Sequence, residues 1–176
     1  DIEDGDLSIF IRLGTDFVNN YYEYEIPLVL SNPDSLEGLP QEDSYKLEVW
    51  KLENEFDFPL ELLKDLKLER NAAGFSVSEE YIKELENPEK RFNDIVRVKG
   101  NPNYGMVRSV MVGMRNREGG NFNALNAEVW INELRLTGLD NRGGVAAIGR
   151  LDMQLADFGN LTLAGNFSSI GFGALD

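Results

Sequence analysis

The sequence of 176 residues contains neither histidine nor cysteine. A Ser-His-Asp triad, a Cys-His pair and any metal site built from imidazole or thiolate ligands are therefore excluded within this chain, and so are disulfides. The lack of cysteine leaves the redox compartment open, because a domain of this size can fold without disulfides. Long apolar runs are missing too, and none reaches the roughly 18–20 residues of a spanning helix.

Basic residues are also scarce. Lysine and arginine number 17 against 31 aspartates and glutamates, for a net charge of −14. Such a surface repels phosphate backbones, so we expect no nucleic-acid partner. Acidic residues gather at 1–6 and again at 79–89, and we interpret both patches as solvated surface. The alternative is a calcium site at Asp4 and Asp6, but the spacing is not that of an EF-hand. We predict no metal and no cofactor.

What the chain does contain is alternation. Apolar residues make up 42% and glycines number 17, which favours a globular domain with many turns. Apolar and polar side chains alternate with the period of a β-strand in several segments. These predicted strands cover residues 7–13, 22–30, 45–52, 95–99, 107–115 and 127–137. Within the second, Pro27 indicates a sheet edge or a bulge.

Two short helices interrupt this pattern. Pro59 suits the first turn of one helix, in which Leu60 and Leu63 recur at helical spacing. Residues 76–79 (SVSE) resemble a capping box that would open a second helix through Leu85. The predicted fold over residues 1–139 is therefore a mainly β, antiparallel, jelly-roll-like β-sandwich decorated by two short helices. Its predicted core is Ile9, Ile11, Ile26, Leu28, Val49, Val110, Val112, Val129 and Ile131.

The character of the chain changes after Gly138. Residues 140–144 (DNRGG) read as a linker, and two clean alternating segments follow on either side of a turn at residues 157–160. Each segment has about 10 residues, which matches the roughly 9–11 of a tilted membrane-spanning strand. Residues 140–176 are therefore predicted to be a linker and an amphipathic hairpin. A hairpin packed on the sandwich would show the same pattern.

Several stretches resemble one known family. They are EVWINELRLT at residues 128–137, GGVAAIGRLDMQLADFGNLTLAGN downstream, IRLGTDFVNNYYEYEIPL at 11–28 and VKGNPNYGMVRSVMVGMRN at 98–116. Together they resemble the SprA/Sov family, the gliding-motility and type IX secretion translocon of Bacteroidetes. The most distinctive positions are Trp130, Asn132, Glu133, Leu134 and Arg135.

This resemblance implies an internal segment of a very large outer-membrane β-barrel, with residues 1–139 inserted as a domain and the hairpin serving as barrel strands. It implies a non-catalytic structural role in protein export. Its partners would be the rest of the parent barrel, secretion-system subunits and exported cargo proteins. Because the turn at 157–160 is short, we expect it on the periplasmic side, which places the sandwich at the cell surface.

A second reading is a carbohydrate-binding jelly roll. Its glycan would stack on an exposed aromatic side chain, and the candidates are Tyr21 and Trp50. Tyr21 alternates with Glu23 and is expected on the surface, whereas Tyr22 and Tyr24 share a face with Ile26 and are expected in the core. Glu23 and Glu25 have a spacing that glycosidases can use, but such pairs arise by chance in so acidic a chain. We expect Glu133 to pair with Arg135.

Overall fold

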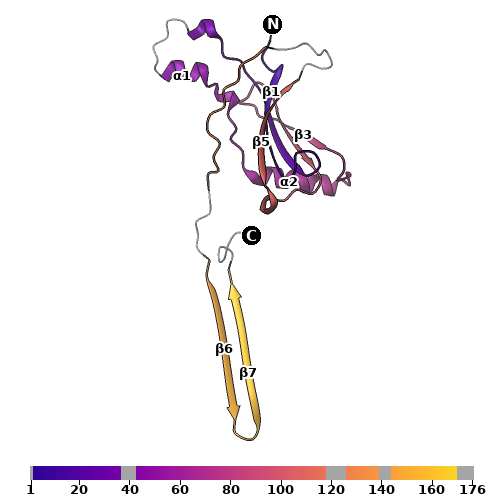
Figure 1. Cartoon of the computed structure of the whole chain (residues 1–176), viewed down its shortest axis with the longest axis vertical. Coiled ribbons are helices and arrows are strands. Elements are labelled where there is room, and N and C mark those ends of the chain that lie inside the picture. The colour runs from indigo at the N-terminus through magenta and orange to yellow at the C-terminus, as the bar shows by residue number, and fades with distance from the viewer. Residues whose placement is uncertain (1, 37–42, 118–125, 139–143, 170–176) are drawn as a thin grey trace. The chain divides into compact units, whose positions relative to one another are not determined.

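The computed structural model describes residues 2–36, 43–117, 126–138 and 144–169. Contacts divide the chain into two compact units, Asp1–Ala127 and Glu128–Asp176. The first unit holds an antiparallel five-stranded sheet, and the second holds a two-stranded hairpin (Figure 1).

The sheet of the first unit has the strand order β3-β4-β2-β1-β5, so β2 is its central strand and β3 and β5 form its edges. The strands are β1 (Leu7–Gly14), β2 (Tyr21–Pro27), β3 (Tyr81–Leu85), β4 (Asp94–Lys99) and β5 (Ser109–Asn116). The helices are α1 (Asp43–Val49) and α2 (Leu60–Ala72), with 3-10 turns at Pro33–Leu36, Leu52–Asn54 and Tyr104–Met106.

One face of the sheet is apolar and carries the core. Tyr22, Tyr24 and Ile26 of β2 project from it, and each is at most 5% exposed. Helix α2 covers this face with Leu63 and Leu66, which are almost fully buried. The ring of Tyr24 stacks on Phe58 at 4.0 Å between centroids. The second layer of the core is therefore a helix and its flanking aromatic residues.

A turn next to β4 fastens α2 to the sheet. The fully buried Arg70 donates from Nη1 to the Gly100 carbonyl at 2.6 Å, and Lys67 Nζ donates to the Pro102 carbonyl at 2.8 Å. Burial lowers the pKa of Lys67 and of Arg70. Gly100 has a φ of +72°, and a β-carbon there would overlap the Asn19 carbonyl. This turn therefore requires glycine on two counts.

The loop between β1 and β2 is organised by one carboxylate. Asp16 Oδ1 accepts hydrogen bonds from the backbone N–H groups of Val18, Asn19 and Asn20, at 2.9, 2.5 and 3.2 Å. Asp16 Oδ2 also accepts from the side-chain amide of Asn20 at 3.0 Å. These donors, led by the Asn19 N–H, hold the pKa of Asp16 well below its usual range.

The mainly β class, the antiparallel pairing and the C-terminal hairpin are confirmed. The number of two helices is confirmed as well, although only α2 lies where a helix was predicted. The expected strands at residues 7–13, 22–30, 95–99 and 107–115 correspond to β1, β2, β4 and β5. Within the described residues, however, the first unit contains one sheet, and α2 occupies the place that a second sheet would take in a jelly-roll sandwich.

Three predicted elements were wrong. Residues 45–52 belong to helix α1 and the turn after it, because Leu47, Trp50 and Leu52 stay exposed and none of the described strands pairs with them. The supposed capping box at 76–79 forms a turn in which the Ser78 N–H donates to Ser76 Oγ at 3.2 Å, and strand β3 follows it. Residues 127–137 form no strand, because the described structure gives them no ladder partner.

The predicted core was right in four positions. Ile9, Ile11, Ile26 and Leu28 are buried. Val110 and Ile131 were assigned wrongly, since they are 48% and 61% exposed. The first lies on an edge strand, and the second lies in the unpaired segment of the other unit. Val49, Val112 and Val129 are only partly buried.

Pro27 ends the central strand instead of lying on an edge strand. It pairs with Ser8 of β1, while the pairing of β2 with β4 stops two residues earlier, at Glu25 and Ile95. The Leu28 N–H donates to the Leu7 carbonyl of β1 at 2.8 Å. Because successive nitrogens point to opposite sides of a strand, the nitrogen of Pro27 points away from β1. It points to the side of β4, but beyond the end of that strand. Proline therefore costs the sheet no hydrogen bond here.

The second unit contains β6 (Ala146–Leu155) and β7 (Gly159–Ser168), two strands of ten residues in antiparallel register. One face bears the cross-strand pairs Leu151–Leu163 and Met153–Leu161, and the other bears Asp152–Thr162. The loop between the strands is three residues long, with Ala156 at a φ of +43°. Both faces of the hairpin are exposed.

Candidate functional site

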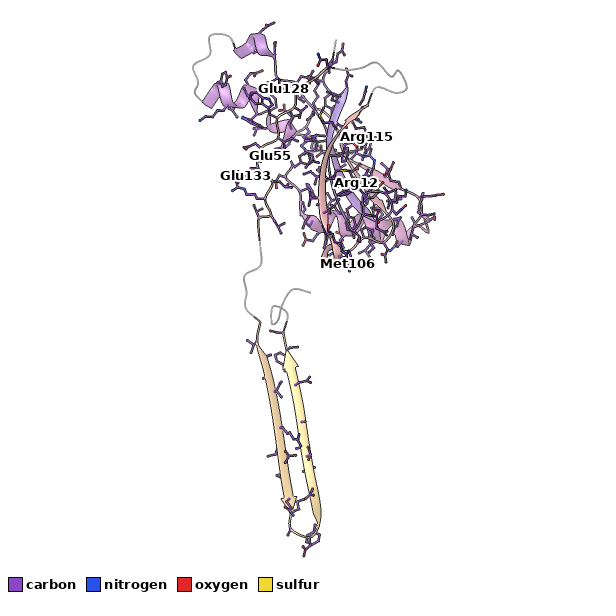
Figure 2. All side chains as sticks on the ribbon, in the orientation of Figure 1. Arg12, Glu55, Met106, Arg115, Glu128 and Glu133 are labelled. Atoms are coloured by element: carbon purple, nitrogen blue, oxygen red, sulfur yellow. The ribbon has the colours of Figure 1, made fainter. Side chains whose placement is uncertain are left out.

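The face of the sheet opposite α2 carries a cluster of charges, which we call the arginine–glutamate network: Arg12, Glu23, Glu25, Arg97 and Arg115. The alternation YYEYEIP in β2 directs both glutamates to this face and its tyrosines at 22 and 24 to the core. Arg12 on β1 and Arg97 on β4 lie directly opposite Glu23, one from each side. Figure 2 shows Arg12 and Arg115 in the region of β1 and β5.

Hydrogen bonds saturate both carboxylates. Glu23 Oε2 accepts from Arg12 Nε at 2.7 Å, while its Oε1 accepts from Arg97 Nη1 at 2.8 Å and from Arg115 Nη2 at 3.0 Å. Glu25 pairs with the same two arginines, Arg97 and Arg115, and accepts from Ser8 Oγ at 2.6 Å. Four adjacent strands, β4, β2, β1 and β5, thus share one set of ion pairs.

The network is buried under its own side chains. Both glutamates are 0% exposed, whereas the side chains of Arg12 and Arg97 are 14% and 11% exposed. A buried carboxylate is strongly destabilising unless it is paired and hydrogen-bonded, and both glutamates meet that condition. Chemically, charged groups neutralised in this way fix strand register well and are poor candidates for proton transfer.

Aromatic rings flank the network. The guanidinium carbon of Arg12 lies 3.8 Å from the centroid of the Tyr21 ring, and that of Arg115 lies 4.7 Å from the centroid of Phe10. The Phe10 ring occupies the space beside Gly113, where a β-carbon would overlap it. The sheet therefore needs glycine at this position of β5.

Tyr21 was expected on the surface, and this was wrong because it is only 4% exposed. Its hydroxyl donates to Glu80 Oε1 at 2.5 Å, and its ring is covered by Arg12. Burial, together with the nearby Glu80 carboxylate, raises the pKa of Tyr21 to about 12. Tyr22 and Tyr24 are buried as expected.

Trp50 is 43% exposed and follows helix α1, where its backbone N–H donates to the Lys46 carbonyl at 2.7 Å. No contact joins Trp50 to Tyr21 in the described part of the chain. The two candidates for a sugar-stacking platform are thus not brought together, and one of them is buried.

The distinctive segment at 128–137 is exposed. Trp130 and Leu134 are 64% and 58% exposed, Asn132 is exposed as well, and Trp130 Nε1 donates to Glu128 Oε1 at 2.6 Å. Glu133 and Arg135 form the expected ion pair at 3.5 Å, with both side chains mostly in solvent. An exposed pair of this kind contributes little to stability.

Asp4 and Asp6 are engaged within the protein. Asp4 Oδ1 accepts from the Leu30 N–H at 2.7 Å and its Oδ2 pairs with Arg91, while Asp6 Oδ2 accepts from the Glu3 N–H. Among the described residues, no three acidic side chains gather in a way that could hold a metal ion. None of the described helices has the length and apolarity to cross a membrane.

The arginines of the network were missed by sequence reasoning. Period two places Arg12 on the polar face of its strand, but nothing local shows that β1 and β4 both border β2. A usable signal was the presence of two glutamates on one strand face with single arginines on the polar faces of three other predicted strands. Opposite charges on neighbouring strands favour one register.

These observations define the class of protein: a mainly β chain whose sheet is organised by internal ion pairs and which continues into an amphipathic hairpin. The profile of the SprA_N family, described as motility related/secretion protein, matches residues 1–176. The chain therefore belongs to the SprA_N family of motility- and secretion-related proteins. No curated protein matches the chain.

Proposed function

We propose that this chain is a non-catalytic structural segment of an outer-membrane translocon that serves type IX secretion and gliding motility. The family match supports the coarser role in motility or secretion. The observation that carries the finer role is the hairpin of β6 and β7. Its strands have the length of membrane-spanning β-strands, and one face is apolar from end to end.

The polar face of the hairpin fits the same role. Asp152 Oδ2 accepts from Arg150 Nε at 2.8 Å, and Asp152 Oδ1 accepts from Thr162 Oγ1 at 2.7 Å. In the proposed barrel this face lines the water-filled interior and the leucine face meets lipid. The partners of the chain are then the neighbouring barrel strands, other secretion-system subunits and exported cargo.

Two cross-strand pairs allow a matched test in the parent protein. The double substitution Leu151→Asp and Leu163→Asp places two carboxylates on the apolar face, and Gln154→Asp with Asn160→Asp places two on the polar face. A carboxylate on the lipid face of a barrel is destabilising, and most so near the bilayer midplane. We expect the first variant to lose protein export and outer-membrane recovery and the second to keep both. Equal behaviour of the two variants would refute the proposal.

The alternative role as a carbohydrate-binding jelly roll lacks a supporting observation. The platform would need aromatic side chains that lie together and face solvent. Tyr21 is buried beneath Arg12, and Trp50 stands apart from it.

A further inference from the structure

The two edges of the five-stranded sheet differ in how they are protected. Natural edge strands are usually short or carry charges, prolines or bulges that prevent pairing with another chain. Strand β3 is five residues long and includes Lys83 and Glu84. Strand β5 is eight residues long, reads SVMVGMRN, and has Arg115 as its single charged residue. The β5 edge therefore lacks the usual protection.

Alternate residues within β5 direct their backbone N–H and C=O groups away from β1. The Arg117 N–H donates to the Asp6 carbonyl at 2.7 Å, in the same register that pairs Ser8 with Arg115. Because the pattern alternates, the odd-numbered residues of β5 bond to β1 and the even-numbered ones point away from it. The backbone groups of Val110, Val112 and Met114 thus face outward, where no described strand lies.

The side chains at this edge extend the apolar face of the sheet. Val110 and Met114 pair with Leu13 and Ile9 across β1, and each remains 48% exposed. Val112 lies between them and is partly buried. An added strand with apolar side chains at alternate positions would continue the core face at this edge.

Positive charge marks both ends of the edge. Arg108 precedes β5 and Arg117 follows it, and both are exposed. Among the described residues, Arg108 has no ion-pair partner, and Arg117 approaches a carboxylate only at Glu25, at 3.9 Å. Residues 107–117 contain no aspartate or glutamate, although the chain as a whole carries a charge of −14.

We propose that the free edge of β5 is a strand-addition site for an acidic, extended peptide segment. Backbone hydrogen bonds would supply most of the affinity, as in other complexes in which a peptide extends a sheet. Alternate apolar side chains of the peptide would pack against Val110 and Met114. Acidic side chains at the two ends of the peptide would pair with Arg108 and Arg117. A second copy of β5 fits less well, because it brings more arginines and no carboxylate to this edge.

The test uses the full chain and a labelled probe peptide, ETTVTVTVTE, whose valines and end charges match an antiparallel partner of residues 108–117. The control is KTTVTVTVTK, which has the same valines and the opposite charge. Fluorescence anisotropy should show saturable binding of the acidic peptide and at least about tenfold weaker binding of the basic one, a difference that two favourable charge pairs can supply. Added salt should reduce that difference.

Variants then separate backbone pairing from charge. Val110→Pro removes an outward N–H, and Val110→Thr keeps it, so the first should lose most of the binding and the second should retain it. Replacing Arg108 and Arg117 by serine should abolish the preference for the acidic peptide and leave β5 itself intact. Circular dichroism of each variant shows whether the sheet is folded.

Three results would overturn the proposal. One is no saturable binding of the acidic peptide, and another is equal binding of the acidic and basic peptides at low salt. The third is a dimer in sedimentation that Val110→Pro dissociates and that the acidic peptide fails to disrupt, since this would make a second copy the occupant of the edge. If Val110→Pro does not fold, the double arginine variant still decides the matter.

Discussion

Glu23 on β2 lies directly opposite Arg12 on β1, and Glu23 Oε2 approaches Arg12 Nη2 to 2.5 Å while the glutamate is completely buried. The pair connects two strands that a six-residue loop already joins. Glu23 also connects two further strands to this pair, because Arg97 and Arg115 reach the same carboxylate from β4 and β5. The ion pairs of the buried Glu23 carboxylate therefore depend on the register of four strands.

Glu23→Gln should be strongly destabilising. The amide keeps the shape of the side chain but removes the charge that three guanidinium groups share, and breaking a buried pair in this way costs about 3–5 kcal/mol. Urea unfolding of the sheet measures this. The matched control is Glu69→Gln, because Glu69 pairs with Lys83 where both side chains are 44% exposed. It should cost less than about 1 kcal/mol, and similar losses in both variants would contradict a special role for the network.

Gly113→Ala should also destabilise the sheet, by about 1–3 kcal/mol, because a β-carbon there overlaps the Phe10 ring. Phe10→Leu in the same chain should restore part of the loss by making room. The control is Gly149→Ala on β6, where a β-carbon would meet nothing within 4 Å. If Gly113→Ala matches that control, the close approach of Phe10 is not a constraint on the strand.

Local alternation predicted β1, β2, β4 and β5, and each of these strands pairs with at least one neighbouring strand of the sheet. The same reasoning failed at residues 45–52, where the alternating apolar side chains are exposed and the backbone forms helix α1. Period two shows that a strand is possible, and a neighbouring strand that pairs with the segment makes it favourable. That information is not local, so it is absent from the pattern.

The candidate site shows a second reason why the sequence alone predicts only part of the structure. The alternation correctly put Glu23 and Glu25 on one face, and it put Tyr21 there as well. It could not show that this face would be covered by arginines from neighbouring strands, so Tyr21 was expected in solvent. Strand order and register decide which polar side chains meet, and both depend on the whole sheet.

Asp16 should make stability depend on pH at the acid end. Its pKa in the folded protein lies below the ordinary value of 3.8, since backbone and amide donors favour the charged carboxylate. The stabilisation is therefore fully present above the unfolded pKa and is lost as pH falls through the folded pKa. Asp16→Ala should lower the urea midpoint at pH 7 and do so much less near pH 2. A loss that does not change with pH would contradict the assigned role of the charge.

Removing residues 138–176 should leave a folded first unit. The five-stranded sheet and α2 lie entirely within Asp1–Ala127. The predicted domain boundary at residues 139 and 140 would also keep this unit whole. The shortened chain should unfold cooperatively in urea with the same midpoint as the sheet in the full chain. A broad, non-cooperative transition would mean that the removed residues complete its core.

The proposed translocon role predicts on which side of the outer membrane the first unit lies. Outer-membrane barrels place short turns on the periplasmic side and long insertions outside. The β6–β7 loop has three residues, so β6 would enter from the outer rim, and the residues before it would lie at the cell surface. Asp34→Cys introduces a thiol at an exposed position into a segment that has none. In intact cells a membrane-impermeant maleimide should label this variant of the parent protein above the level of the unsubstituted protein. Labelling that requires permeabilised outer membranes would reverse the orientation and leave the family assignment intact.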